Sequence, residues 1–195
     1  MIDTTTKTTT ADSGSGTRVP GAALHRIRRL ATRRPAQTGA LALTQFALGA
    51  AAGRPEDPDY YRSLRQAPFA PPSWAFGPAW AIAKTGSSYA LLRTAAHTSG
   101  GRRRRLLALF GADAAVFVTF SYVYFRRRSP VLAAVWTGAD AAVTVALTRE
   151  LAGEDITAAA ALAPQLAWLT LATPVALWQA ATNPDPLLGT PALVD

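Results

Sequence analysis

The sequence predicts an all-α fold of the polytopic membrane class, a bundle of five transmembrane helices. Apolar residues make up 49% of the 195-residue chain and charged residues only 16%, which is more apolar than a typical soluble domain. Five stretches approach or exceed the length of about 20 apolar residues that crosses a bilayer as a helix. Arginines gather between these stretches, where they can reach lipid phosphates.

The first expected span covers residues 36–53 and follows a cluster of arginines, as a signal anchor does. The other spans cover about residues 74–96, 106–125, 130–148 and 156–182. Most of these stretches lack the polar face that a soluble helix repeats about every 3.6 residues. Small residues, such as Ala158 to Ala161, recur within them and permit close helix packing in lipid. A soluble all-helical globule is therefore the less favoured alternative.

The ends of the chain differ from this membrane domain, which we place at residues 36–183. Residues 1–35 are rich in Thr, Ser, Gly and Arg, a composition that predicts a disordered basic tail. Residues 184–195 are predicted to form a C-terminal tail. Arginine counts on the two sides of a five-crossing topology slightly favour a cytoplasmic N-terminus. The alanine- and arginine-rich composition indicates a bacterial gene, so a bacterial plasma membrane is the expected location.

Composition also excludes several kinds of site. The chain has no cysteine, which removes disulfides, thiolate zinc sites and cysteine nucleophiles. His25 and His97 lie far apart in sequence, so no metal site is predicted. The net charge of +8 is spread between apolar spans without a recognition motif, so no nucleic-acid partner is predicted. No nucleophile–base pair or phosphate-binding loop is evident, and we assign no catalytic residue.

One loop stands out, the stretch LRQAPFAPPSWAFGPAW from Leu64 to Trp80. Its prolines suppress regular structure, and its aromatic rings suit a membrane interface or an apolar cavity. We expect a shaped lid over a membrane site, built from Pro71, Pro72, Trp74 and Phe76. The two prolines would keep the lid extended and limit the entropy lost on ligand closure. Trp74 is interpreted as an interfacial anchor, and Trp136 and Trp178 as packing or interface residues.

Three segments carry a resemblance to a known family. YYRSLRQAPFAPPSWAFGPAW, which begins at Tyr60, is similar to the family's first loop and the start of its second helix. PQLAWLTLAT, from Pro164 to Thr173, is similar to a Pro-x-Leu-x-Trp signature of helix five. YFRRRSP, from Tyr124 to Pro130, is similar to the aromatic pair and basic turn that close helix three. Over about residues 38–183 the chain thus resembles the TspO/translocator-protein family, the tryptophan-rich sensory proteins or peripheral benzodiazepine receptors.

The resemblance implies a five-helix membrane protein, often a homodimer, with a cavity beneath the loop between helices one and two. Family members bind porphyrins and other flat hydrophobic molecules, and some bind sterols. The resemblance therefore implies a porphyrin- or haem-type ligand and no required cofactor. Lys84 stands where the family has a tyrosine, and Asp113 where it has a glutamine. By position the expected ligand-binding residues are Phe69, Trp80, Lys84, Asp113, Phe117, Phe120, Trp168 and Ala172.

Three ionisable residues fall within the expected spans: Lys84, Asp113 and Asp140. A charge at the bilayer centre costs about 2.5–3.5 kcal/mol, so such residues normally pair or line a wet cavity. At a rise of about 1.5 Å per residue the three lie at similar depth, and Lys84 can reach either acid. Two interpretations stay open. The cluster is either a structural ion pair, or Lys84 offers a cation to a ligand carboxylate while Asp113 sets its charge state.

These observations support three kinds of function. The leading one is an integral membrane protein that binds or transports a flat hydrophobic ligand, with the lipid bilayer and that small molecule as its partners. The second is a membrane enzyme that degrades bound porphyrin oxidatively with the help of a nearby tryptophan. The third is a regulatory or structural membrane partner whose cavity is vestigial.

Overall fold

The computed structural model describes the backbone of residues 21–53 and 59–194, and the side chains of residues 35–52 and 59–194. The chain divides into two units, Met1–Arg33 and Arg34–Asp195, and the helices that pack together belong to the second. Residues 1–20, which belong to the predicted tail, lie outside the described residues.

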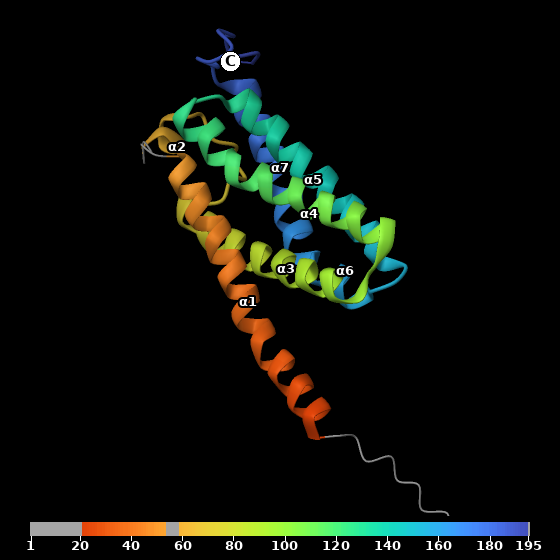
Figure 1. Ribbon diagram of the computed structural model, residues 1–195. Coiled ribbons are helices and arrows are strands. Elements are labelled where there is room, and N and C mark those ends of the chain that lie inside the picture. Colours follow the sequence, from red (N-terminus) through yellow and green to blue (C-terminus); the bar gives the residue numbers. More distant parts are fainter. Residues whose placement is uncertain (1–20, 54–58, 195) are drawn as a thin grey trace, which may run out of the picture. The chain divides into compact units, whose positions relative to one another are not determined.

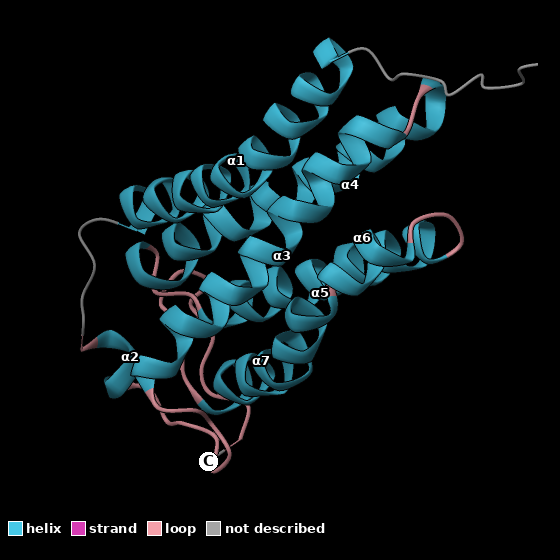
Figure 2. Cartoon of the chain, turned by 90° about the horizontal axis from the view of Figure 1, so that it is seen from below, coloured by secondary structure: helices cyan, strands magenta, loops and turns pink. Residues whose placement is uncertain are grey.

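The described part of the chain is built from helices joined by short loops (Figures 1 and 2). Two elements are irregular: η1 is a single 3₁₀ turn, and η2 is a π turn that continues α4. In chain order the elements are α1 (Gly21–Gly53), α2 (Tyr60–Ser63), η1 (Ser73–Ala75), α3 (Phe76–His97), α4 (Gly100–Ser121), η2 (Tyr122–Arg126), α5 (Pro130–Ala152), α6 (Ile156–Ala161) and α7 (Ala163–Thr182).

Three of the described helical stretches are long and apolar enough to cross a membrane: Gly100–Arg126, Pro130–Ala152 and Ile156–Thr182. They coincide with the third, fourth and fifth predicted spans, which confirms the all-α membrane class. α1 and α3 do not meet the same test. α3 carries Lys84 and Arg93, and these two cations lower its mean hydropathy.

Arg102 to Arg105, which the predicted spans leave in a loop between the second and third helices, lie instead in the first turns of α4. Arginine is a good helix former, and these side chains find partners on α5 and the turn after it. Arg105 pairs with Glu150 at 2.6 Å, and Arg102 pairs with Glu154 at 2.8 Å. The third helix therefore begins before the predicted residue 106, and its basic end is tied to the end of α5.

Two other boundaries differ from those expected. α1 begins at Gly21, inside the segment predicted as a disordered tail, where alanine, leucine and arginine all favour a helix. The fifth predicted span is interrupted at Leu162, between α6 and α7. Pro164 follows directly in the first turn of α7, a position where its missing N–H costs nothing.

The packing centres on α5, which contacts α7 and α4 most extensively, while α3 packs on α7 and α6 (Figure 1). A buried apolar cluster lies where α3, α4, α5 and α6 meet, and comprises Ala90, Leu106, Phe110, Leu147, Leu151, Ala158, Ala159 and Leu162. A smaller cluster of Tyr60, Tyr124 and Ala133 lies toward the other end of α5. The space between these clusters holds the polar groups and the cavity.

α3 and α6 approach each other closely at Gly86 on α3. A Cβ atom built there would lie 2.1 Å from the carbonyl oxygen of Ala161, the last residue of α6. Any side chain at this position would collide with backbone rather than with a movable side chain. Gly86 therefore lets α3 reach the break between α6 and α7, as small residues do in membrane bundles.

The residues after α7 fold back instead of trailing away as the predicted tail. Asp185 is 1% exposed and accepts hydrogen bonds from Ser129 Oγ at 2.6 Å and from the Val131 amide at 3.1 Å. Its other oxygen accepts from the amides of Leu187 and Leu188, each at 3.0 Å. One carboxylate thus joins the start of α5 to the C-terminal segment.

We predict that Gly86→Ala lowers the free energy of unfolding by about 1–3 kcal/mol, since the added methyl group overpacks the α3–α6 contact. Gly138→Ala is the matched control, because a Cβ there has no atom within 4 Å and alanine is the better helix former. Thermal unfolding of both variants in detergent measures the difference. Equal stability of Gly86→Ala and wild type would contradict the close approach.

A second prediction concerns pH. Burial alone would raise the pKa of Asp185, but hydrogen bonds from Ser129 and the three amides outweigh it and hold that pKa below its usual range. The stabilisation is therefore complete above about pH 4 and is lost as pH falls through the lower folded-state pKa. Asp185→Asn should cost roughly 1–3 kcal/mol at neutral pH and weaken the acid dependence of unfolding. Asp59→Asn, which changes an exposed carboxylate, should do neither.

Candidate functional site

A cavity of about 510 Å³ lies within the second unit, between the part of α1 in that unit and α3, α4, η2, α5 and α7. Aromatic rings form much of its wall. They come from Phe46 of α1, Tyr61 of α2, Phe76 and Trp80 of α3, Phe117 and Phe120 of α4, Tyr124 and Phe125 of η2, and Trp136 of α5. The wall is thus an aromatic shell assembled from most of the helices.

The rings support one another mainly by edge contacts. Phe117 lies 5.2 Å from both Phe46 and Trp80, measured between ring centroids. Phe120 stacks on Tyr124 at 5.4 Å with an interplanar angle of 18°. Such geometries are the ones that aromatic pairs prefer, and they fix the shape of the wall.

Small residues provide the room between these rings. Gly49 and Ala50 line the cavity from α1, Gly77 from α3, and Ala133 from α5. On α7 the lining residues Ala172, Val175, Ala176 and Gln179 follow the spacing of one helix face. Larger side chains at these positions would occupy the cavity.

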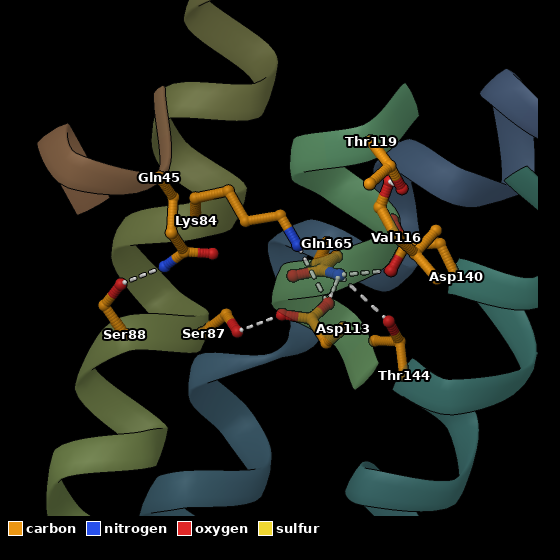
Figure 3. Close-up of polar contacts among 10 residues, drawn as sticks. All are labelled: Gln45, Lys84, Ser87, Ser88, Asp113, Val116, Thr119, Asp140, Thr144 and Gln165. Carbon is orange, nitrogen blue, oxygen red and sulfur yellow. Dashed lines mark hydrogen bonds and ion pairs between the residues drawn. The ribbon is translucent and has the colours of Figure 1, made fainter. Parts of the chain in front are cut away.

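Beneath this wall lies a buried polar cluster that links four helices (Figure 3). Lys84 Nζ on α3 pairs with Asp113 Oδ1 on α4 at 2.8 Å, and Ser87 Oγ donates to Asp113 Oδ2 at 2.9 Å. Gln165 Nε2 on α7 lies 2.5 Å from Asp113 Oδ1 and 3.1 Å from Asp140 Oδ1 on α5. The same nitrogen lies 3.0 Å from Thr144 Oγ1.

Lys84 is fully buried and is separated from the cavity by aromatic rings. Its Nζ lies 4.8 Å from the centroid of Phe117 and 5.5 Å from that of Trp80, both of which line the cavity. These cation–π contacts add to the ion pair with Asp113. Of the ionisable residues in the cluster, Asp140 is the one found among the described lining residues of the cavity. The structural interpretation of the Lys84–Asp113 pair therefore fits this geometry.

The structure brings together some of the predicted ligand-binding residues and separates others. Trp80, Phe117, Phe120 and Ala172 line the cavity, as does Phe76 of the predicted lid. Lys84 and Asp113 lie behind the wall. Trp168 stands behind Phe76 and Trp80, with ring centroids 5.2 Å and 6.2 Å away, and its Nε1 has no hydrogen-bond partner among the described residues.

The predicted lid is a loop with fixed attachments. Tyr61 donates a hydrogen bond to the carbonyl of Pro71 at 3.1 Å, and burial raises the pKa of Tyr61, which keeps this phenol a donor. Asn183 bonds both the amide and the carbonyl of Arg65, at 2.7 and 3.1 Å. Figure 2 shows these loops gathered with α2 near the C-terminus.

A chain of amides continues from the loop into the wall. Gln66 Oε1 accepts from Gln179 Nε2 at 2.8 Å, and Gln179 Oε1 accepts from the Tyr124 hydroxyl at 2.9 Å. At the rim, Phe69 is 49% exposed and contacts Trp178, and Trp74 is 75% exposed. Phe69, Pro72 and Trp74 thus belong to the loop's outer side rather than to the cavity.

Sequence reasoning missed several lining residues. Trp136 was expected to be a packing residue, but it lines the cavity and donates from Nε1 to Thr119 Oγ1 at 2.9 Å. Ala133, Trp136, Thr137 and Asp140 lie on one face of α5. Their spacing relative to the intramembrane Asp140 was the signal that could have revealed this face. No group of three acidic or histidine side chains that could hold a metal occurs among the described residues.

Comparison with known proteins identifies the family of this chain. A family model, the TspO/MBR family, matches residues 38–178, well over half of the chain. No curated protein matches the chain. The matched segment contains the three apolar membrane helices almost completely, together with the loop and the cavity. The chain therefore belongs to the TspO/MBR family and is an integral membrane protein whose apolar helices contact the lipid bilayer.

Proposed function

We propose that this chain binds or transports a flat hydrophobic ligand, porphyrin-like in shape, in the aromatic cavity beneath the loop of residues 64–75. The cavity carries the proposal: its volume of about 510 Å³ lies in the range of about 300–1,000 Å³ that small-molecule sites occupy. Its aromatic wall offers faces and edges against which a planar ligand can stack.

The proposal includes five membrane crossings, formed by α1, α3, α4 with η2, α5, and α6 with α7. Buried polar contacts support the inclusion of α1 and α3, whose own hydropathy is modest. Gln45 of α1 donates to Ser88 of α3 at 3.2 Å, and both side chains are buried. A homodimer, a bacterial plasma membrane and a cytoplasmic N-terminus stay predictions of the sequence.

Oxidative degradation of a bound porphyrin is the second candidate, and one observation favours keeping it. Trp80 and Trp136 both line the cavity, where an indole would lie against a bound ligand. Loss of protoporphyrin absorbance only under light and oxygen would support degradation. A spectral shift in the dark without loss of absorbance would support binding alone.

Ligand binding is tested with protoporphyrin IX dimethyl ester, a neutral planar probe, through quenching of tryptophan fluorescence in purified protein. Ala172→Leu should weaken binding about tenfold or more, because the added atoms fill cavity space. Ala167→Leu, an exposed position on the same helix, is the control and should leave affinity unchanged. Equal affinity in the two variants, or no binding by wild type, would refute the assignment of the cavity.

The buried position of Lys84 leads to a separate prediction. Lys84→Ala leaves Asp113 as an uncompensated buried charge and should cost about 3–5 kcal/mol of stability. Replacing both partners, as in Lys84→Met with Asp113→Leu, should recover most of this loss. Thermal unfolding of wild type and of these two variants measures the difference. A stable Lys84→Ala protein that loses affinity only for carboxylate-bearing porphyrin would instead support the ligand role of Lys84.

A further inference from the structure

The described wall of the cavity contains one acidic side chain and no basic side chain. Among its described lining residues, Asp140 is the acidic one, and lysine, arginine and histidine do not occur. The remaining polar groups are neutral hydroxyls, amides and ring N–H groups, such as those of Thr137 and Gln179. An anionic ligand would find no countercharge in this wall. A cationic ligand would find one carboxyl group.

The polar cluster behind the wall contains one cation and two carboxyl groups. Asp113 holds the cation, since its oxygens accept from Lys84, Ser87 and Gln165. Asp140 is 2% exposed and accepts from the neutral amide of Gln165. Lys84 pairs with Asp113, and Asp140 forms no ion pair with a described residue. A buried carboxylate without such a partner is costly, so the proton resides on Asp140.

Among the described residues, only Lys84 brings a positive charge near Asp140. Asp113 faces it from α4, and Lys84 extends from α3 into the same cluster. α7 contributes the amides of Gln165 and Gln179, η2 contributes the phenol of Tyr124, and α6 has no titratable side chain. At the start of α4, Arg105 pairs with Glu150 near the far end of α5, and Arg102 pairs with Glu154 in the turn that follows.

We propose that the cavity takes a flat cationic ligand in exchange for the proton on Asp140. This proposal rests on the proposed function and names the charge class of the ligand. In the empty cavity the Asp140 carboxyl group is neutral. When a ligand bearing a protonated amine enters, the O–H bond of Asp140 breaks, and the carboxylate pairs with the ammonium group. One proton leaves to solvent for each cation bound, so charge in the buried site is conserved.

The exchange has a thermodynamic signature. Cation affinity should rise about tenfold per pH unit while Asp140 is protonated in the unliganded protein, and should level off above its pKa. A neutral ligand of the same shape displaces no proton, so its affinity should not depend on pH. An anionic analogue should bind more weakly than either, because its charge meets only Asp140.

The experiment uses the full chain in lipid nanodiscs and three anthracene probes of matched shape. They are 9-(aminomethyl)anthracene, a cation; 9-methylanthracene, which is neutral; and anthracene-9-carboxylate. Energy transfer from the cavity tryptophans to anthracene reports binding between about pH 5 and about pH 8. Asp140→Asn should abolish the pH dependence of amine binding and the preference for the amine. Asp59→Asn makes the same substitution at an exposed carboxylate outside the cavity and should retain both.

Calorimetry of wild-type protein in buffers of different ionisation enthalpy counts the released protons without any variant. About one proton released per bound amine supports the exchange. Amine binding without proton release, or with the same pH dependence in Asp140→Asn, overturns it. Binding of 9-methylanthracene separates the two proposals. If the neutral probe binds and the amine shows no exchange, only the exchange fails; if no probe binds, the cavity assignment fails as well.

Discussion

The ion pair between Lys84 and Asp113 is the interaction on which the arrangement of the helices depends. Helices in lipid gain little from burying apolar surface against one another, so polar contacts and close packing must hold them in register. This pair joins α3 to α4, and Gln165 extends it to α5 and α7 through Asp140 and Thr144. A sliding movement of any of these helices by one turn would leave a buried charge or amide without its partner, which is far costlier than a shifted apolar contact.

The cavity and this cluster share their walls. Trp80 and Phe117 face the cavity on one side and the Lys84 ammonium group on the other. The rings therefore separate the cation from the cavity, and their faces help to stabilise the cation. Asp140 has the opposite placement, because it belongs to the cluster and also reaches the cavity. The loop of residues 64–75 is held by Asn183 and Gln179, so its position depends on the end of α7.

Some of this arrangement could be predicted from the sequence. The rest could not, because the sequence gives the depth of a residue along its helix but not the direction in which its side chain points. Counting residues along the spans placed Lys84 and Asp113 at one depth, and the structure pairs them. Depth does not give rotation about the helix axis, and spans that are apolar on all sides leave rotation undetermined. For this reason the sequence predicts a packing or interface role for Trp136, and it leaves Lys84 open between a structural ion pair and a ligand contact. The break at Leu162 and the π turn at Tyr122–Arg126 also change which side chains face inward, and hydropathy carries no signal for either.

The cavity owes its volume to missing side-chain atoms rather than to separated backbones. Ala133, Ala172, Ala176 and Gly77 border the open space, while the helices that bear them are packed together through the buried polar cluster. Substitutions that add a methyl group at these residues can therefore change the shape of the cavity without moving a helix. Proteins of this architecture could diverge in ligand shape through substitutions at such small lining residues while the supporting bundle stays the same, so the scaffold and its selectivity can evolve largely independently.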